Sequence, residues 1–181
     1  MIAKIRSLKI DRSSLRLKMT LEKRPKLIGF DLDYTLWPFW VDTHVDPPFH
    51  KDKNGKVVDS RNVKINFYKE VPKVLQKLHS EGCILAAVSR TTDPEGANQL
   101  LELWDWDRFF TYKEIYPGRK TTHFQRIKEA SGLEYREMLF FDDEERNKID
   151  LNTIGVLTIM VPDGVTEELV KQGLVTFSNK N

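Results

Sequence analysis

The sequence is poor in cysteine, in long apolar runs and in net charge. Its 181 residues include a single cysteine, Cys83, which excludes an internal disulfide framework and any metal site built from several cysteines. No uninterrupted apolar run approaches the ~18 residues that a membrane-spanning helix needs, so no membrane partner is expected. A hydrophobic content of 40% supports a core, and a chain of this length is expected to form one domain.

The net charge of +2 is unevenly distributed along the chain. Residues 1–26 carry nine Lys or Arg and two acids, whereas residues 27–181 hold 20 basic and 25 acidic residues. Because the positive charge belongs to one end rather than to the body, we expect no nucleic-acid partner. We interpret residues 1–25 as a basic extension that is disordered, is a mitochondrial presequence, or precedes the true initiator Met19. We expect a cytoplasmic protein, with the nucleus as an alternative and the mitochondrion if the extension is a presequence.

Apolar runs alternate with helical patterns over residues 26–181, which we treat as a single domain. Runs without strict alternation are typical of strands that are buried on both faces. The runs are Leu27–Phe30, Cys83–Val88, Phe109–Tyr116, Met138–Phe141 and Val156–Val161. Between them, helical spacing predicts helices over 71–81, over 94–104, before Gly132 and over 166–171. The alternation predicts an α/β fold, with a doubly wound, mainly parallel, Rossmann-like sheet of about five strands.

Residues 37–66 do not follow this alternation. They are rich in proline, aspartate, histidine and aromatic residues, and Asn54-Gly55 is a turn signal typical of hairpins. We therefore expect a β-hairpin flap over about residues 37–66, too small to form its own core.

Polar side chains follow four of the expected strands, where each strand ends. The carboxyl ends of parallel strands share one edge of a sheet, and ligands bind there in open α/β folds. We therefore expect these side chains to converge: Asp31 and Asp33 after the first run, Ser89 and Arg90 after the second, Lys120 after the third, and Asp142 and Asp143 after the fourth.

Several carboxylates close together repel one another, and oxygen ligands of this kind favour Mg²⁺. Ser89 and Lys120 remain as donors for an anion. A carboxylate can itself act as a nucleophile, so this edge suits phosphoryl transfer through an aspartyl-phosphate. An Asp-x-Asp pattern is not distinctive by itself, because Asp105 and Asp107 repeat it; that second pair follows no apolar run and predicts a solvated helix end.

Other side chains near these segments have ordinary interpretations. The four histidines lack metal-ligand spacing and are expected to be structural or exposed, although His123, close to Lys120, is a candidate for approaching the site. Trp37, Phe39 and Trp40 suit either the mouth of the site or packing within the flap.

Four segments resemble the motifs of the haloacid dehalogenase superfamily, and more closely its magnesium-dependent phosphatase branch. The resemblance covers about residues 26–175, and it is specific because the wider superfamily usually has glycine where Tyr34 stands. The segments are FDLDYTLWP from Phe30, AVSRT from Ala87, GRKTTHF from Gly118 and LFFDDEERN from Leu139.

The resemblance implies a role for each matching residue. Asp31 corresponds to the nucleophile and Asp33 to the general acid and base. Substrate phosphate is expected to contact the backbone of Leu32 and the residues Asp33, Ser89, Arg90 and Lys120. Mg²⁺ is expected on Asp31, on the backbone carbonyl of Asp33, on Asp143 directly and on Asp142 as its partner.

The spacing of the motifs leaves no room for a cap domain, so the site is expected to be open. The implied substrates are a phosphorylated small molecule, such as a sugar phosphate, or a phosphoprotein carrying phosphotyrosine, hydrolysed by a monomer. The alternative is a non-catalytic domain on the same fold that binds a phosphorylated ligand or a nucleic acid. A binding domain has no need of the paired acids Asp31 and Asp33.

Overall fold

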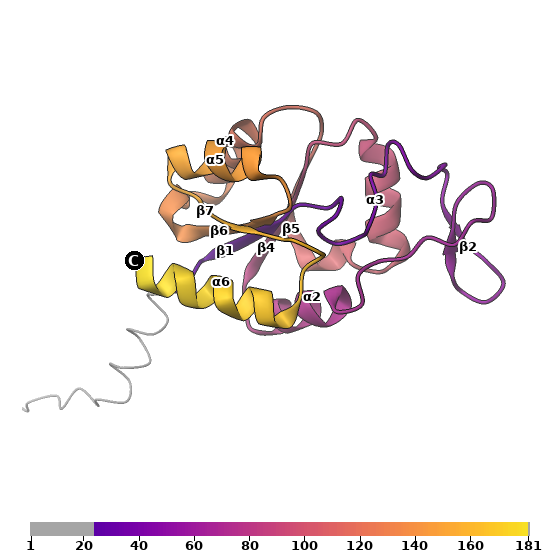
Figure 1. Ribbon diagram of the computed structural model, residues 1–181, viewed down its shortest axis with the longest axis horizontal. Coiled ribbons are helices and arrows are strands. Elements are labelled where there is room, and N and C mark those ends of the chain that lie inside the picture. Colours follow the sequence, from indigo (N-terminus) through magenta and orange to yellow (C-terminus); the bar gives the residue numbers. More distant parts are fainter. Residues whose placement is uncertain (1–23, 181) are drawn as a thin grey trace, which may run out of the picture.

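The computed structural model describes residues 24–180, so the interpretations of residues 1–23 lie outside the described chain. Within residues 24–180, no helix has the length and apolar character needed to cross a bilayer. Strands and helices alternate along most of this chain (Figure 1). In order they are β1 (Leu27–Phe30), β2 (His50–Lys51), β3 (Val57–Val58), α2 (Val71–Ser80), β4 (Ile84–Ser89), α3 (Pro94–Leu103), η1 (Asp107–Phe109), β5 (Phe110–Ile115), α4 (Lys120–Ser131), η2 (Tyr135–Glu137), β6 (Met138–Asp142), α5 (Glu145–Ile154), β7 (Leu157–Met160) and α6 (Glu167–Lys180).

The central sheet has five parallel strands in the order β5-β4-β1-β6-β7. Strand β1 lies in the middle, where Phe30 is in register with Ala87 of β4 on one side and Phe141 of β6 on the other. The chain builds one half of the sheet from β4 and β5 and the other half from β6 and β7. The predicted doubly wound α/β fold is confirmed, and its topological switch point lies beside β1.

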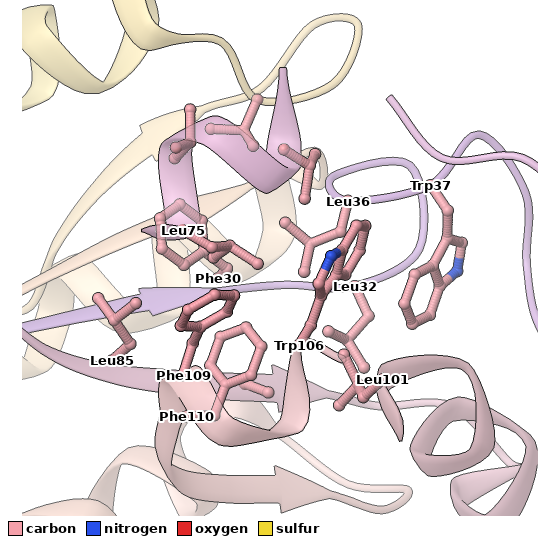
Figure 2. Packing of buried hydrophobic residues seen from close by; sticks show 14 of the residues in the cluster. Phe30, Leu32, Leu36, Trp37, Leu75, Leu85, Leu101, Trp106, Phe109 and Phe110 are labelled. Atoms are coloured by element: carbon pink, nitrogen blue, oxygen red, sulfur yellow. The ribbon is translucent and has the colours of Figure 1, made fainter. Parts of the chain in front are cut away.

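Alternate residues of each strand point to opposite faces of the sheet, so the sheet separates two apolar clusters. Phe30 belongs to the larger cluster, together with side chains of α2, α3 and α6. Figure 2 shows Phe30 with Leu75 of α2 and Leu101 of α3 in this cluster. Leu27 belongs to the smaller cluster, under α4 and α5. Gly29 also faces α4 and α5, and a Cβ there would lie 2.9 Å from the Phe140 ring. Glycine is therefore required at this position for close packing.

The predicted hairpin flap is formed by β2 and β3, which pair antiparallel and project beside α3 (Figure 1). Between β1 and β4 the chain contains this hairpin and α2, and between β4 and β5 it contains α3 and the short η1 turn. Neither connection holds a cap domain, as the spacing predicts.

The helix predictions are correct in part. Asp93 caps α3 by accepting the N–H of Gly96 (2.9 Å), and Gly132 ends α4 in a left-handed conformation. Helix α6 extends well beyond the predicted 166–171. Helix α5 was not predicted, because Leu151 and Asn147 are its only buried residues and it lacks an apolar stripe.

Candidate active site

The carboxyl ends of β1, β4 and β6 surround a cavity of about 260 Å³. Most of the predicted site residues line it, but Leu32 and Asp142 do not. The lining residues are Asp31, Asp33, Trp40, Asp42, Ser89, Arg90, Thr91, Lys120, Asp143, Glu144, Arg146 and Asn147.

Asp31 and Lys120 form a buried ion pair at the centre of this cavity. Asp31 follows β1, and its N–H donates to the carbonyl of Phe141 (2.9 Å), which fixes the start of the loop. The Lys120 ammonium contacts both Asp31 Oδ1 and the carbonyl of Val88, and its side chain is 1% exposed. Burial raises the pKa of Asp31, and Asp142 and Asp33 add to the rise against the effect of Lys120. The Lys120 ammonium therefore offsets only part of the effect of burial on the pKa of Asp31.

The two adjacent acids after β6 have different environments. Asp142 is fully buried and accepts hydrogen bonds from Asn147 Nδ2 (3.1 and 3.0 Å) and from the N–H of Glu144 (2.7 Å). The side chain of Asp143 has no donor of this kind from another described residue and faces the cavity. Burial, with Asp142 and Glu144 nearby, raises the pKa of Asp143 to about 6. Asp142 is thus fixed by the protein, while Asp143 is available to a ligand.

The donor chemistry of this cluster fits a hard divalent cation. Carboxylate oxygens of Asp31, Asp142 and Asp143 lie within 4.8 Å of one another. A small cation such as Mg²⁺ binds one or two carboxylates and keeps several waters. Asp33 is not part of this three-carboxylate group; its predicted contribution to metal binding is through its carbonyl.

The Asp33 side chain points toward the flap side of the cavity. Its Oδ1 accepts hydrogen bonds from Trp37 Nε1 (2.7 Å) and from the N–H of Val41 (3.1 Å). Burial raises the pKa of Asp33 to about 6, although both hydrogen bonds lower it. A carboxyl group with such a pKa can both release and regain a proton near neutral pH.

Ser89 and Arg90 contribute polar groups from the end of β4. The Ser89 hydroxyl accepts the N–H of Thr91 (3.2 Å), which leaves its proton for an anion. Arg90 Nη1 donates to Asn147 Oδ1 (3.1 Å), and the same nitrogen lies 3.8 Å from Glu144 Oε2. Its Nε is buried and without a hydrogen-bond partner among the described residues. An anionic ligand beside Arg90 would satisfy this group.

Leu32 contributes differently from its neighbours. Its side chain is fully buried in the larger apolar cluster and points away from the cavity. Its carbonyl accepts the N–H groups of Thr35 (3.2 Å) and Leu36 (2.7 Å), which closes the turn after β1. The backbone of Leu32 therefore remains its only predicted route to a substrate.

Other side chains line the cavity although the sequence predicted no role for them. Asn147 joins Arg90 to Asp142 across the cavity. Asp42 Oδ2 accepts both the N–H (3.0 Å) and the hydroxyl (2.7 Å) of Thr92, which ties the flap loop to the loop after β4. Asn147 lies in the first turn of α5 and is the last residue of the LFFDDEERN segment, so its place in that segment is the signal that could have found it.

Two alternatives for the surrounding residues are now resolved. His123 does not reach the cavity; it is buried, stacks on Tyr116 and makes ring-nitrogen contacts with the carbonyls of Arg119 (2.8 Å) and Tyr116 (2.9 Å). Trp37 and Phe39 are buried and stacked on each other, so only Trp40, which is 48% exposed, lies at the mouth. Asp105 and Asp107 lie after α3, away from the cavity, and pair with Arg108 and Lys113.

Comparison with known proteins supports the same reading of the sequence. A family model for acid phosphatases matches residues 23–180. Magnesium-dependent phosphatase 1 from Homo sapiens is 53% identical over 158 residues, which cover 87% of this chain and 90% of the relative. A HAD-like hydrolase superfamily protein from Schizosaccharomyces pombe is 43% identical over 143 residues, covering 73% and 83%.

A solved structure shows the same fold at much lower identity. The 3-deoxy-D-manno-octulosonate 8-phosphate phosphatase of Moraxella catarrhalis, solved with magnesium and phosphate, superposes with a TM-score of 0.55 at 14% identity, covering 90% of this chain and 93% of that one. With the matches above, this chain belongs to the acid phosphatase family and is a magnesium-dependent phosphatase of the haloacid dehalogenase superfamily.

Proposed function

We propose that the protein hydrolyses phosphomonoesters through a phosphorylated Asp31. The observation that carries this proposal is the position of a buried carboxylate, Asp31, between one lysine and two further acids, with Asp33 on the same loop. A site that only binds phosphate gains nothing from several carboxylates, because they repel the ligand.

In the first step, an oxygen of Asp31 attacks phosphorus and the bond from phosphorus to the leaving oxygen breaks. The electron pair stays on that oxygen, and Asp33 donates a proton to it. The pKa of Asp33, raised to about 6, suits this transfer. The product alcohol or phenol leaves, and Asp31 is left as an acyl phosphate.

In the second step, water attacks the same phosphorus and gives a proton to Asp33. The bond between phosphorus and Asp31 breaks, which restores the carboxylate and releases inorganic phosphate. The two steps consume one water and leave both aspartates unchanged. Lys120 and the Ser89 hydroxyl stabilise the negative charge on the transferring group.

Asp31 and Asp143, with the carbonyl of Asp33, would hold Mg²⁺. Asp142 would support Asp143 as its partner, because its carboxylate is held in place by hydrogen bonds from Asn147 and from the N–H of Glu144. When bound, the cation neutralises the carboxylates and allows an anionic phosphate to approach. We further propose that phosphotyrosine-type or sugar phosphates are the substrates, because without a cap the cavity accepts a phosphate on a large carrier.

The test uses p-nitrophenyl phosphate with Mg²⁺ or with EDTA. We expect hydrolysis that requires Mg²⁺ and is abolished in Asp31→Asn. In Asp33→Asn, we expect a phosphorylated protein to accumulate, detected as a mass increase on Asp31 after acid quenching. Hydrolysis that persists in Asp31→Asn would contradict the proposal. A panel of phosphopeptides and sugar phosphates, compared by kcat/KM, then distinguishes the two substrate classes.

A further inference from the structure

A second concave site lies beside the flap, away from the catalytic cavity. It is a groove of about 680 Å³ between the β2–β3 hairpin, residues 64–69 and the C-terminal end of α3, and we call it the flap groove. None of its lining residues lines the catalytic cavity. Its volume is within the range of established ligand sites, so it is large enough for an apolar side chain and the adjoining backbone of a ligand.

The rim of the flap groove carries unpaired positive charge. Four exposed lysines line it, and no aspartate or glutamate does: Lys51, Lys56, Lys64 and Lys69. None of the four forms an ion pair with a carboxylate in residues 24–180. Asp52 of the hairpin turn accepts the backbone N–H groups of Asn54 and Lys56, at 2.8 Å each, and its carboxylate attracts the Lys56 ammonium without reaching ion-pair distance.

This lack of partners is particular to the flap region. On the adjoining helix α2, Lys73 and Lys77 both reach Glu167. Over the described part of the chain, the lysines without an ion pair are Lys51, Lys53, Lys56, Lys64, Lys69 and Lys180, of which all but Lys180 lie within residues 51–69. Like charges gathered in one place repel, and a negatively charged ligand relieves that repulsion.

The floor of the groove is apolar and aromatic. Phe67, Trp104 and Trp106 form a packed trio whose ring centroids lie 4.9 to 5.1 Å apart. The Phe67 ring meets both tryptophan rings edge-to-face, at 77° and 66°. The rings pack against one another and do not present a row of parallel open faces, so they suit an aliphatic or aromatic side chain better than a series of stacked bases.

We propose that the flap groove binds an acidic polypeptide segment that carries an apolar anchor residue. The lysines at the rim pair with the glutamate or aspartate side chains of the segment, and the anchor lies on the aromatic floor. Single-stranded nucleic acid is disfavoured, because no arginine lines the groove and its rings are packed against one another. The proposal does not depend on the phosphatase reaction.

The test measures binding to a short fluorescein-labelled peptide of glutamates with one central phenylalanine, by fluorescence anisotropy on the full chain. We expect binding that weakens with added salt. A peptide in which serine replaces the phenylalanine should bind more weakly than the original peptide at the same salt concentration, and a matched peptide of lysines should not bind. Failure to bind the glutamate peptide, or tighter binding of oligothymidylate, overturns the proposal.

A matched pair of variants locates the binding. Lys51→Glu with Lys64→Glu reverses two groove charges, and we expect affinity to fall about tenfold or more. Lys53→Glu with Lys180→Glu changes the net charge equally, at unpaired lysines that do not line the groove, and should leave affinity unchanged. Equal losses in both variants would mean non-specific attraction and would overturn the proposal. Thermal unfolding followed by circular dichroism verifies that both variants fold.

Discussion

At the scale of single residues, the site depends on one buried cation among several acids. Lys120 contacts Asp31 and lies 3.6 Å from Asp142, and it is the first residue of α4. This position at the start of α4 lets the Lys120 side chain reach both Asp31, which follows β1, and the carbonyl of Val88 in β4. Removing one partner of a buried ion pair leaves the other charge uncompensated.

We predict that Lys120→Met lowers kcat by ~10²–10³ on every substrate, because in the proposed reaction the lost ammonium group stabilises the transferring phosphate itself. Steady-state kinetics on p-nitrophenyl phosphate and on a sugar phosphate measure the effect. Lys128→Met is the control: it lies on the same helix, pairs with Glu134 at the surface and should retain activity. A loss confined to one substrate would assign Lys120 to the leaving group instead.

A second prediction concerns the cost of ionising Asp33. Its folded pKa is raised from 3.8 to about 6, so the neutral form is favoured. The stability that the protonated Asp33 carboxyl contributes is complete below the pKa that Asp33 has in the unfolded chain, and it is lost as the pH rises through about 6. In EDTA and above pH ~7, the free energy of unfolding of Asp33→Asn, measured in urea, should therefore exceed that of wild type by up to ~3 kcal/mol. Near pH ~4 the two free energies should differ little. A gain of equal size at both pH values would contradict this origin.

The site residues differ in how far the sequence could predict them. Asp31, Ser89 and Asp143 stand at the ends of apolar runs, so their convergence follows from the topology of a parallel sheet. Asp42 stands in a polar stretch where no periodicity marks it, and Asn147 ends the LFFDDEERN segment in a helix that lacks an apolar stripe. Their roles depend on the path of the chain in three dimensions, which a local pattern does not contain.

At the scale of elements, β1, β4 and β6 are predictable because burial on both faces makes each of them a continuous apolar run, whereas the edge strand β5 mixes buried and exposed residues. Helix α2 was predictable because its buried positions recur at helical spacing, and α3 because Asp93 and Pro94 mark its start. Helix α5 covers its face of the sheet with few apolar residues, so no stripe revealed it. The length of α6 was underestimated for a similar reason: its buried residues, Val170, Gly173 and Phe177, include a glycine.

The packing of Gly29 gives a prediction at this scale. A methyl group there would lie 2.9 Å from the Phe140 ring, between β1 and α4, where little can move. We expect Gly29→Ala to lower the free energy of unfolding by ~1–3 kcal/mol, measured in urea. Adding Phe140→Leu should recover part of this loss, because the smaller side chain makes room. Additive losses in the double variant would exclude the steric explanation.

At the scale of the whole molecule, a metal ion held by the proposed cluster of Asp31, Asp142 and Asp143 would couple metal binding to folding. A ligand that binds only the folded state stabilises it, by ~2.7 kcal/mol at a hundredfold excess over its Kd. We therefore expect Mg²⁺ to raise the Tm of the wild-type protein, and Asp143→Asn to reduce that rise. In EDTA, Asp143→Asn should have a higher Tm than wild type, because the substitution removes the repulsion between Asp143 and Asp142. Asp105→Asn, at an exposed ion pair, is the control and should respond to Mg²⁺ as wild type does. An unchanged Mg²⁺ response in Asp143→Asn would remove this residue from the metal site.

The central position of β1 also has a dynamic consequence. Its amide groups are protected by neighbours on both sides, whereas β2 and β3 lie outside the main sheet, where they pair with each other and, through a bridge from Val58 to Lys64, with the segment that follows. Hydrogen–deuterium exchange should therefore be slowest in β1, β4 and β6 and fast in the hairpin. Fluctuations that open the hairpin leave the strand before Asp31 intact, so the Asp31 carboxyl keeps its position relative to β4 and β6 while the flap groove changes shape.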